Sequence, residues 1–234
     1  MKKMPSRYQW LIVVEGDTDA GVFRNLLVLY GIDSDVFYLF PAQGKSKVLK
    51  TNTWPEDLVD RVNHDAGRAD FMGVILVVDT DEDSGRVFRY YERNPHLMYA
   101  DDGPPADRGA FWRLGSLDGR RILPIYGIPV PLRTTGCLET DLLASYGFPT
   151  EGQKQYDRFT EIIKKATAAW NIPLLGGGGH WYDENYKAKM DKFIYAALAK
   201  GFKVSGKKPQ LPREPAVISG LKNVMLSDWK GGRR

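Results

Sequence analysis

The chain has 234 residues, of which 43% are apolar and 12% aromatic, which suffices for the core of one domain of about 100 to 200 residues. The composition excludes global disorder, and no apolar run reaches the about 18 residues of a transmembrane helix, so we expect a cytoplasmic protein without membrane association. A single cysteine, Cys137, excludes an internal disulfide framework and a cysteine-rich zinc site.

The formal net charge of +4 is distributed unevenly along the chain. Residues 200–234 hold nine Lys or Arg against two acids, a net charge of +7, which leaves −3 for residues 1–199. A basic end on a mildly acidic body is typical of proteins that contact nucleic acid, and a solubilising terminus is the alternative. We predict a core over residues 1–150, a helical part over 151–200 packed on it, and a basic tail over 201–234. Five apolar residues of this tail are spaced to dock on the body: Val217, Ile218, Leu221, Val224 and Leu226.

The hydrophobic pattern predicts strands alternating with helices. Residues 10–14 (WLIVV) form a short apolar run that is typical of a strand buried on both faces. Apolar residues then recur at helical spacing from residue 17 until Gly31. Further strands are predicted at 36–40, 73–78 and 121–128, and helices at 54–62, 138–146, 156–170 and 185–200. Residues 94–120 are predicted to form a long loop or excursion at the sheet edge. This alternation predicts an α/β fold, a mostly parallel sheet with helices on both faces, followed by C-terminal helices.

Two acidic motifs each follow a predicted strand, at residues 15–19 (EGDTD) and 79–83 (DTDED). If the first strand lies between the second and third, Glu15 and Asp79 flank the point where the strand order reverses, which is where parallel sheets bind ligands. Carboxylates gathered there would repel one another unless divalent cations neutralised them, and oxygen ligands favour Mg²⁺ or Mn²⁺. The alternative is the ordinary enrichment of Asp and Gly in turns.

The motifs VEGDTD at 14–19, followed by a helix, and VVDTD at 77–81 resemble the two signatures of the Toprim domain, and the resemblance covers about residues 8–150. Topoisomerases, bacterial primases, ribosomal-RNA maturases, recombination mediators and OLD-family nucleases share this domain. The resemblance implies that Glu15 acts as general acid/base or metal ligand. It also implies that Asp79 and Asp81 bind Mg²⁺, with Asp83 as an optional further acid.

The stretch 136–143 (GCLETDLL) is similar to the LEDLL stretch of small stand-alone Toprim proteins related to OLD-family nucleases. One inserted residue leaves open whether Glu139 or Asp141 is the third acidic ligand. Lys187 is similar to a C-terminal lysine of those proteins that faces the acidic cluster, which implies a catalytic or phosphate-neutralising role. A solvated lysine at a helix start is the alternative.

Residues 44–47 (GKSK) are similar to a Gly and Lys turn in many Toprim nucleases, where backbone amides and lysine can hold phosphate. The residues expected to contact phosphate or nucleic acid are Gly16, Lys45, Lys47 and Lys189.

The length leaves no room for the tyrosine-bearing domain of a topoisomerase or the accessory domains of a primase, so water is the simplest nucleophile. We expect a Mg²⁺- or Mn²⁺-dependent nuclease that hydrolyses nucleic-acid phosphodiesters with two metal ions about 3.5 to 4 Å apart. Its resemblance to OLD-family nucleases implies a phage-defence effector, with a separate ATPase partner since the chain has no ATP-binding motif. One alternative is a non-catalytic nucleic-acid-binding or regulatory Toprim protein, and another is an enzyme for a small phosphate ester. Oligomeric state and the choice between DNA and RNA stay open.

Overall fold

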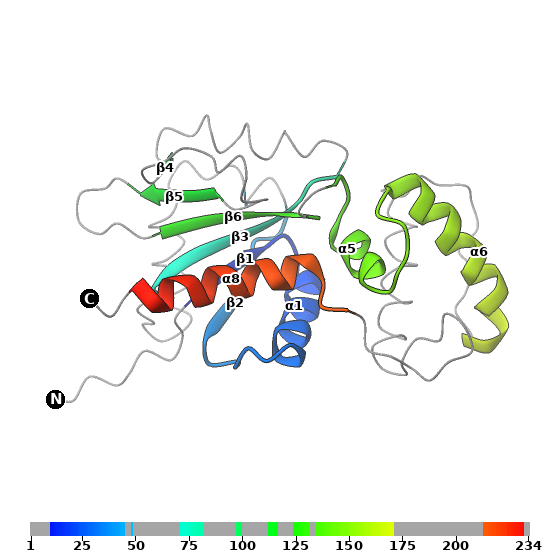
Figure 1. The fold of residues 1–234 in the computed structure, drawn as a ribbon, viewed down its shortest axis with the longest axis horizontal. Coiled ribbons are helices and arrows are strands. Elements are labelled where there is room, and N and C mark those ends of the chain that lie inside the picture. The colour runs from blue at the N-terminus through cyan, green and yellow to red at the C-terminus, as the bar shows by residue number, and fades with distance from the viewer. Residues whose placement is uncertain are drawn as a thin grey trace.

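The structure, a computed structural model, describes residues 10–44, 48, 71–81, 97–99, 112–116, 124–131, 134–170 and 213–231. Within these ranges, six strands form one sheet in the order β2-β1-β3-β6-β5-β4 (Figure 1). Their bounds are β1 Trp10–Val14, β2 Phe37–Pro41, β3 Gly73–Asp79, β4 Leu97–Tyr99, β5 Trp112–Ser116 and β6 Pro124–Val130. The first four strands of that order are parallel, which confirms an α/β fold with a mostly parallel sheet.

The two central strands are apolar because both of their faces are covered. Every residue of β1 is buried, and β3 is buried from Gly73 to Val78. Side chains alternate between the faces of a strand, so a strand in this position needs apolar residues at every position instead of at every second one. This explains the continuous apolar runs in the sequence.

Four helices lie in the described ranges: α1 Asp17–Leu29, α5 Leu138–Ser145, α6 Gly152–Trp170 and α8 Ala216–Gly231. Helix α1 begins after Gly16, whose backbone N–H donates to the Asp19 carboxylate at 2.9 Å. It ends before Gly31, which has a φ of +90°, a left-handed conformation that glycine adopts without strain. The predicted N-terminal strand, turn and helix are therefore confirmed.

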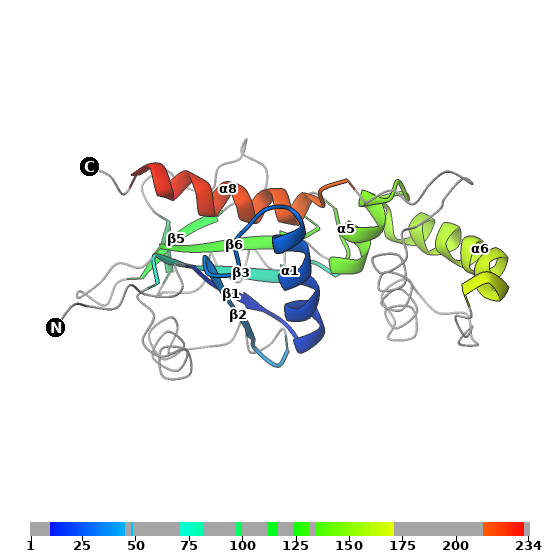
Figure 2. The same cartoon turned by 90° about the horizontal axis from the view of Figure 1, so that it is seen from below.

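Helices α1 and α8 pack on one face of the sheet, and α5 packs against α8 beyond the ends of the strands (Figures 1 and 2). Their apolar side chains share a single buried cluster with Trp10, Ile12 and Val14 of β1. The alternate β1 residues Leu11 and Val13 are fully buried on the opposite face. The described helices thus cover one face of the sheet. The helices predicted at 54–62 and 185–200 lie outside the described residues.

Helix α8 is part of this core. Val217, Ile218, Leu221 and Val224 are buried, so the predicted docking of these residues is confirmed, and the side chain of Leu226 lies outside the described ones. The helix packs against β6 and lies along the sheet in both views (Figures 1 and 2). Part of the segment that charge alone suggested to be a tail is therefore a structural helix.

The region 94–120, expected to be a long loop or excursion, contributes β4 and β5 to the edge of the sheet. β5 pairs antiparallel with β6, and β4 pairs antiparallel with β5. These strands have three and five residues, too few for a clear alternation of apolar and polar side chains. The predicted place at the sheet edge is confirmed, but the described parts of this region are strands because they pair with each other and with β6, which comes later in the chain.

None of the helices in the described ranges combines the length and the apolar character needed to cross a bilayer.

Candidate functional site

The candidate site lies where the central parallel strands end. β1 lies between β2 and β3, which confirms the strand order on which the predicted position of Glu15 and Asp79 depends. The chain leaves β1 toward β2 on one side, and β3 lies on the other side, so the direction of winding reverses between β1 and β3. Glu15 directly follows β1 and Asp79 is the last residue of β3. In parallel sheets this reversal opens a crevice beyond the carboxyl ends of the strands.

The structure brings Glu15 and Asp79 together. The backbone N–H of Asp79 donates to Oε1 of Glu15 at 3.0 Å, across 64 residues of sequence. The Oδ1 of Asp79 in turn accepts from the backbone N–H of Leu138, the first residue of α5, also at 3.0 Å. Both acidic residues are half-buried, so solvent reaches the pair. These hydrogen bonds orient both carboxylates, and bonds to a charged acceptor are stronger than neutral ones.

Thr80 fixes the turn after β3 to the loop that precedes α5. Its backbone N–H donates to the carbonyl of Val130 at 2.8 Å, and its buried hydroxyl accepts from the backbone N–H of Gly136 at 2.9 Å. The next residue, Asp81, donates its backbone N–H to the carbonyl of Gly136 at 2.7 Å. Asp81 is half-buried with a φ of +49°. The end of β3 and the start of α5 are therefore held as one unit.

Gly136 is required at this junction. Its φ is +151°, and a Cβ atom there would lie 2.6 Å from Oγ1 of Thr140. No side chain fits at that distance, so a larger residue would move either the loop or the first turn of α5.

The turn after β2 supports the other side of the pair. The backbone N–H of Gly44 donates to the carbonyl of Glu15 at 2.8 Å, and the side-chain amide of Gln43 donates to Asp17 at 3.2 Å. Gln43 and Gly44 both have positive φ angles, 65° and 121°. The first residue of the predicted phosphate-binding turn thus lies against the backbone beside Glu15, next to Gly16.

The structure gives the two acids of α5 different surroundings. Asp141 is only 5% exposed, and its Oδ2 accepts from the backbone N–H of Val217 in the first turn of α8 at 2.9 Å. Burial raises the pKa of Asp141, while hydrogen bonds from Val217 and Ala216 lower it, and the net shift is upward. Glu139, 8% exposed, directly follows the residue whose amide holds Asp79. Asp141 is thus bound to the start of α8, and Glu139 is adjacent in the chain to the residue that contacts Asp79.

Sequence reasoning missed the contact between Asp141 and α8. The only local signal was that α8 begins after Pro215, which has no N–H and no polar side chain, so the helix lacks a cap of its own. The partner is 76 residues earlier in the chain, and sequence spacing does not identify it.

Other predicted site residues lie outside the described ranges: Lys45, Lys47, Asp83, Lys187 and Lys189. Among the residues that are described, no group of three or more His, Cys, Asp or Glu side chains is placed to hold a metal ion. The described part of the site is therefore the pair Glu15 and Asp79, with Gly16 and Asp81 close to it in the chain and Glu139 directly after Leu138, whose amide contacts Asp79.

The chemistry of this pair fits Mg²⁺ or Mn²⁺. Both donors are carboxylate oxygens at an edge that solvent reaches, whereas Cys137, which precedes Leu138, is fully buried with its Sγ 3.6 Å from Oγ1 of Thr140. Mg²⁺ keeps several water ligands and is usually held by one or two carboxylates together with substrate phosphates. A pair of carboxylates is within the number that proteins usually supply to Mg²⁺.

Comparison of the chain with protein-family models, with curated proteins and with solved structures gave no match. The residues of the site and their geometry are therefore the basis of the function proposed below.

Proposed function

We propose that the chain is a small Mg²⁺- or Mn²⁺-dependent nuclease of the Toprim kind, with its reaction centre at Glu15 and Asp79. The observation that carries the proposal is the hydrogen bond between Oε1 of Glu15 and the backbone of Asp79 at the carboxyl ends of two adjacent parallel strands. Two acidic motifs far apart in the sequence thus meet where this type of sheet binds ligands.

The two carboxylates have different roles in this proposal. Asp79, oriented by the amide of Leu138, is the ligand of the cation. Bound Mg²⁺ would neutralise the phosphate oxygens and polarise the scissile phosphodiester. Glu15 would take the proton of the attacking water, a role that suits a carboxylate that solvent reaches. As the water oxygen bonds to phosphorus, the bond from phosphorus to the leaving oxygen breaks, and solvent protonates that oxygen.

Nucleic acid is the proposed substrate because of the basic excess toward the C-terminus, +7 over residues 200–234. Part of this charge has a structural partner, since Lys222 donates to Glu214 at 2.8 Å. Arg213 is exposed and adds to the positive charge at the start of α8. A phage-defence role and a separate ATPase partner are further expectations of the Toprim resemblance.

The decisive experiment incubates the purified protein with single- and double-stranded DNA and RNA in Mg²⁺ and in Mn²⁺, with EDTA as the control. We expect cleavage that EDTA abolishes.

Calorimetry with Mn²⁺ should show binding to the unsubstituted protein and loss of binding in Asp79→Asn. The matched control is Asp157→Asn, which makes the same chemical change at an exposed position on α6.

Two outcomes would replace the proposal with an alternative. Tight binding of a polynucleotide without turnover in any metal would favour a binding or regulatory protein. Hydrolysis of mononucleotides but not of polynucleotides would favour an enzyme for small phosphate esters. Equal Mn²⁺ binding by the unsubstituted protein and Asp79→Asn would contradict the site assignment.

A further inference from the structure

Asp141 connects two helices that approach the site from different parts of the chain. Its carboxylate belongs to α5, is almost completely buried, and accepts from the backbone N–H of Val217 in α8 at 2.9 Å. The first amides of a helix have no partner within that helix, and a buried carboxylate is a strong acceptor for them. The contact therefore attaches the start of α8 firmly to α5.

The same helix holds Asp79. The amide of Leu138, at the first position of α5, donates to Oδ1 of Asp79 at 3.0 Å. Leu138 and Asp141 are three residues apart, less than one helical turn, in a helix of eight residues. A displacement of Asp141 is therefore transmitted to the amide that orients Asp79.

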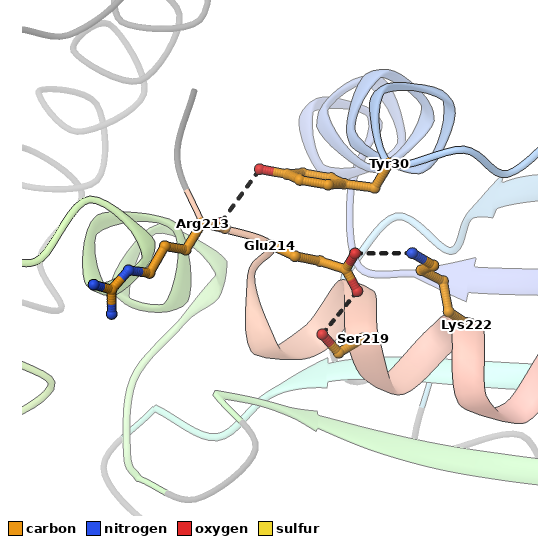
Figure 3. Close-up of polar contacts among 5 residues, drawn as sticks. All are labelled: Tyr30, Arg213, Glu214, Ser219 and Lys222. Carbon is orange, nitrogen blue, oxygen red and sulfur yellow. Dashed lines mark hydrogen bonds and ion pairs between the residues drawn. The ribbon is translucent and has the colours of Figure 1, made fainter. Parts of the chain in front are cut away.

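The start of α8 is also fixed to the far ends of both helices that carry the site. The backbone N–H of Arg213 donates to the carbonyl of Ser145, the last residue of α5, at 3.1 Å. The hydroxyl of Tyr30, just after α1, donates to the carbonyl of Arg213 at 3.3 Å. Figure 3 shows Tyr30 and Arg213 together with Glu214, which accepts from Ser219 and from Lys222, both at 2.8 Å. The residues that lead into α8 are thus hydrogen-bonded both to the end of α5 and to the residue after α1.

We infer that Asp141 is a positioning residue of the site: by docking α8 against α5, it holds the amide of Leu138 in place for Asp79. The inference rests on the proposed function, because it assigns to α8 the support of the metal-binding carboxylate. It gives Asp141 a role that differs from metal ligation, and it predicts coupling between the cation and a helix that contributes no ligand.

The first test compares Asp141→Ala with Asp141→Asn, which keeps an acceptor oxygen for Val217. Asp157→Ala, exposed on α6, is the matched control. Amide hydrogen exchange without metal should become faster at both Val217 and Leu138 in Asp141→Ala. The affinity for Mn²⁺ should fall by about 10-fold, as for other partners that orient ligands. Asp141→Asn should retain most of the affinity, and Asp157→Ala all of it.

The second test uses the unsubstituted chain and so does not depend on whether a variant folds. Coupling between two sites is reciprocal, so saturating Mg²⁺ should slow amide exchange at Val217 as well as at Leu138. Slower exchange at Leu138 with no change at Val217 would overturn the inference and leave the proposed function intact. The same holds if Asp141→Ala binds Mn²⁺ as tightly as the unsubstituted chain. If the unsubstituted chain binds neither metal, the proposed function fails and the inference fails with it.

Discussion

The N-termini of α5 and α8 are held in the same way but in different surroundings. Each has a backbone N–H that donates to a carboxylate from another element, Leu138 to Asp79 at 3.0 Å and Val217 to Asp141 at 2.9 Å. Asp79 is half-buried beside Glu15, whereas Asp141 is 5% exposed inside the core. A carboxylate at a helix start can serve stability or chemistry, and access to solvent distinguishes the two uses.

The largest effect is expected at the solvent-accessible pair. Glu15→Gln should lower the rate of cleavage by about 100-fold or more, because it removes the proposed base while leaving distant phosphate contacts intact. Single-turnover cleavage in Mn²⁺, with binding of the same oligonucleotide measured separately, gives the split between chemistry and affinity. Glu151→Gln, an exposed glutamate before α6, is the control and should keep full activity. A fully active Glu15→Gln protein would mean that the half-buried pair of Glu15 and Asp79 is structural as well.

The next effect concerns the loop that connects the end of β3 to α5. Gly136→Ala places a Cβ atom against Thr140 at a left-handed φ, so we expect a loss of about 2 to 3 kcal/mol in the free energy of unfolding. Urea denaturation measures it. Gly147→Ala is a useful comparison, because Gly147 also has a positive φ, +88°, but has no atom within 4 Å of the added Cβ. Equal losses in the two variants would show that the contact with Thr140 does not matter.

A smaller loss is expected from Thr80→Val. This substitution keeps the shape of the side chain but leaves the buried N–H of Gly136 without its acceptor, which costs about 1 to 2 kcal/mol. Thr80→Ser keeps the hydroxyl and should recover most of that loss. Denaturation of the three proteins under identical conditions decides the point, and a Thr80→Val protein as stable as the unsubstituted chain would contradict it.

The smallest effect belongs to the partly exposed cluster at the start of α8. Burial raises the pKa of Glu214, but hydrogen bonds from Lys222 and Ser219 and the charge of Lys222 lower it by more. A lowered pKa in the folded state means stability that is present at neutral pH and lost on acidification. The loss occurs as the pH falls from about 4.3, the ordinary value for glutamate, through the lowered pKa.

The matching variant for this cluster is Glu214→Gln. At pH 7 it should be less stable than the unsubstituted chain by under about 1 kcal/mol, since exposed ion pairs contribute little. Thermal denaturation of both proteins from about pH 7 down to about pH 3 covers the titration of this carboxylate. The stabilities of Glu214→Gln and of the unsubstituted chain should converge at the acid end. A difference that grows on acidification would reverse the sign and refute the assignment.

The sequence by itself determined the elements that depend on local pattern. The apolar runs of β1 and β3, the periodicity of α1 and the glycine after it all follow from the preferences of neighbouring residues, and all were predicted. The α/β class and the meeting of Glu15 with Asp79 also followed, because alternating strands and helices restrict how the sheet can wind.

Only the tertiary structure decided how the two acids of α5 differ. Glu139 and Asp141 lie in the same short helix, and no local pattern distinguishes them. Asp141 is committed to Val217, 76 residues later, and the short strands β4 and β5 exist through pairing with each other and with β6. Contacts of this range depend on which surfaces the folded chain brings together, and a sequence pattern carries only the preferences of residues close to one another.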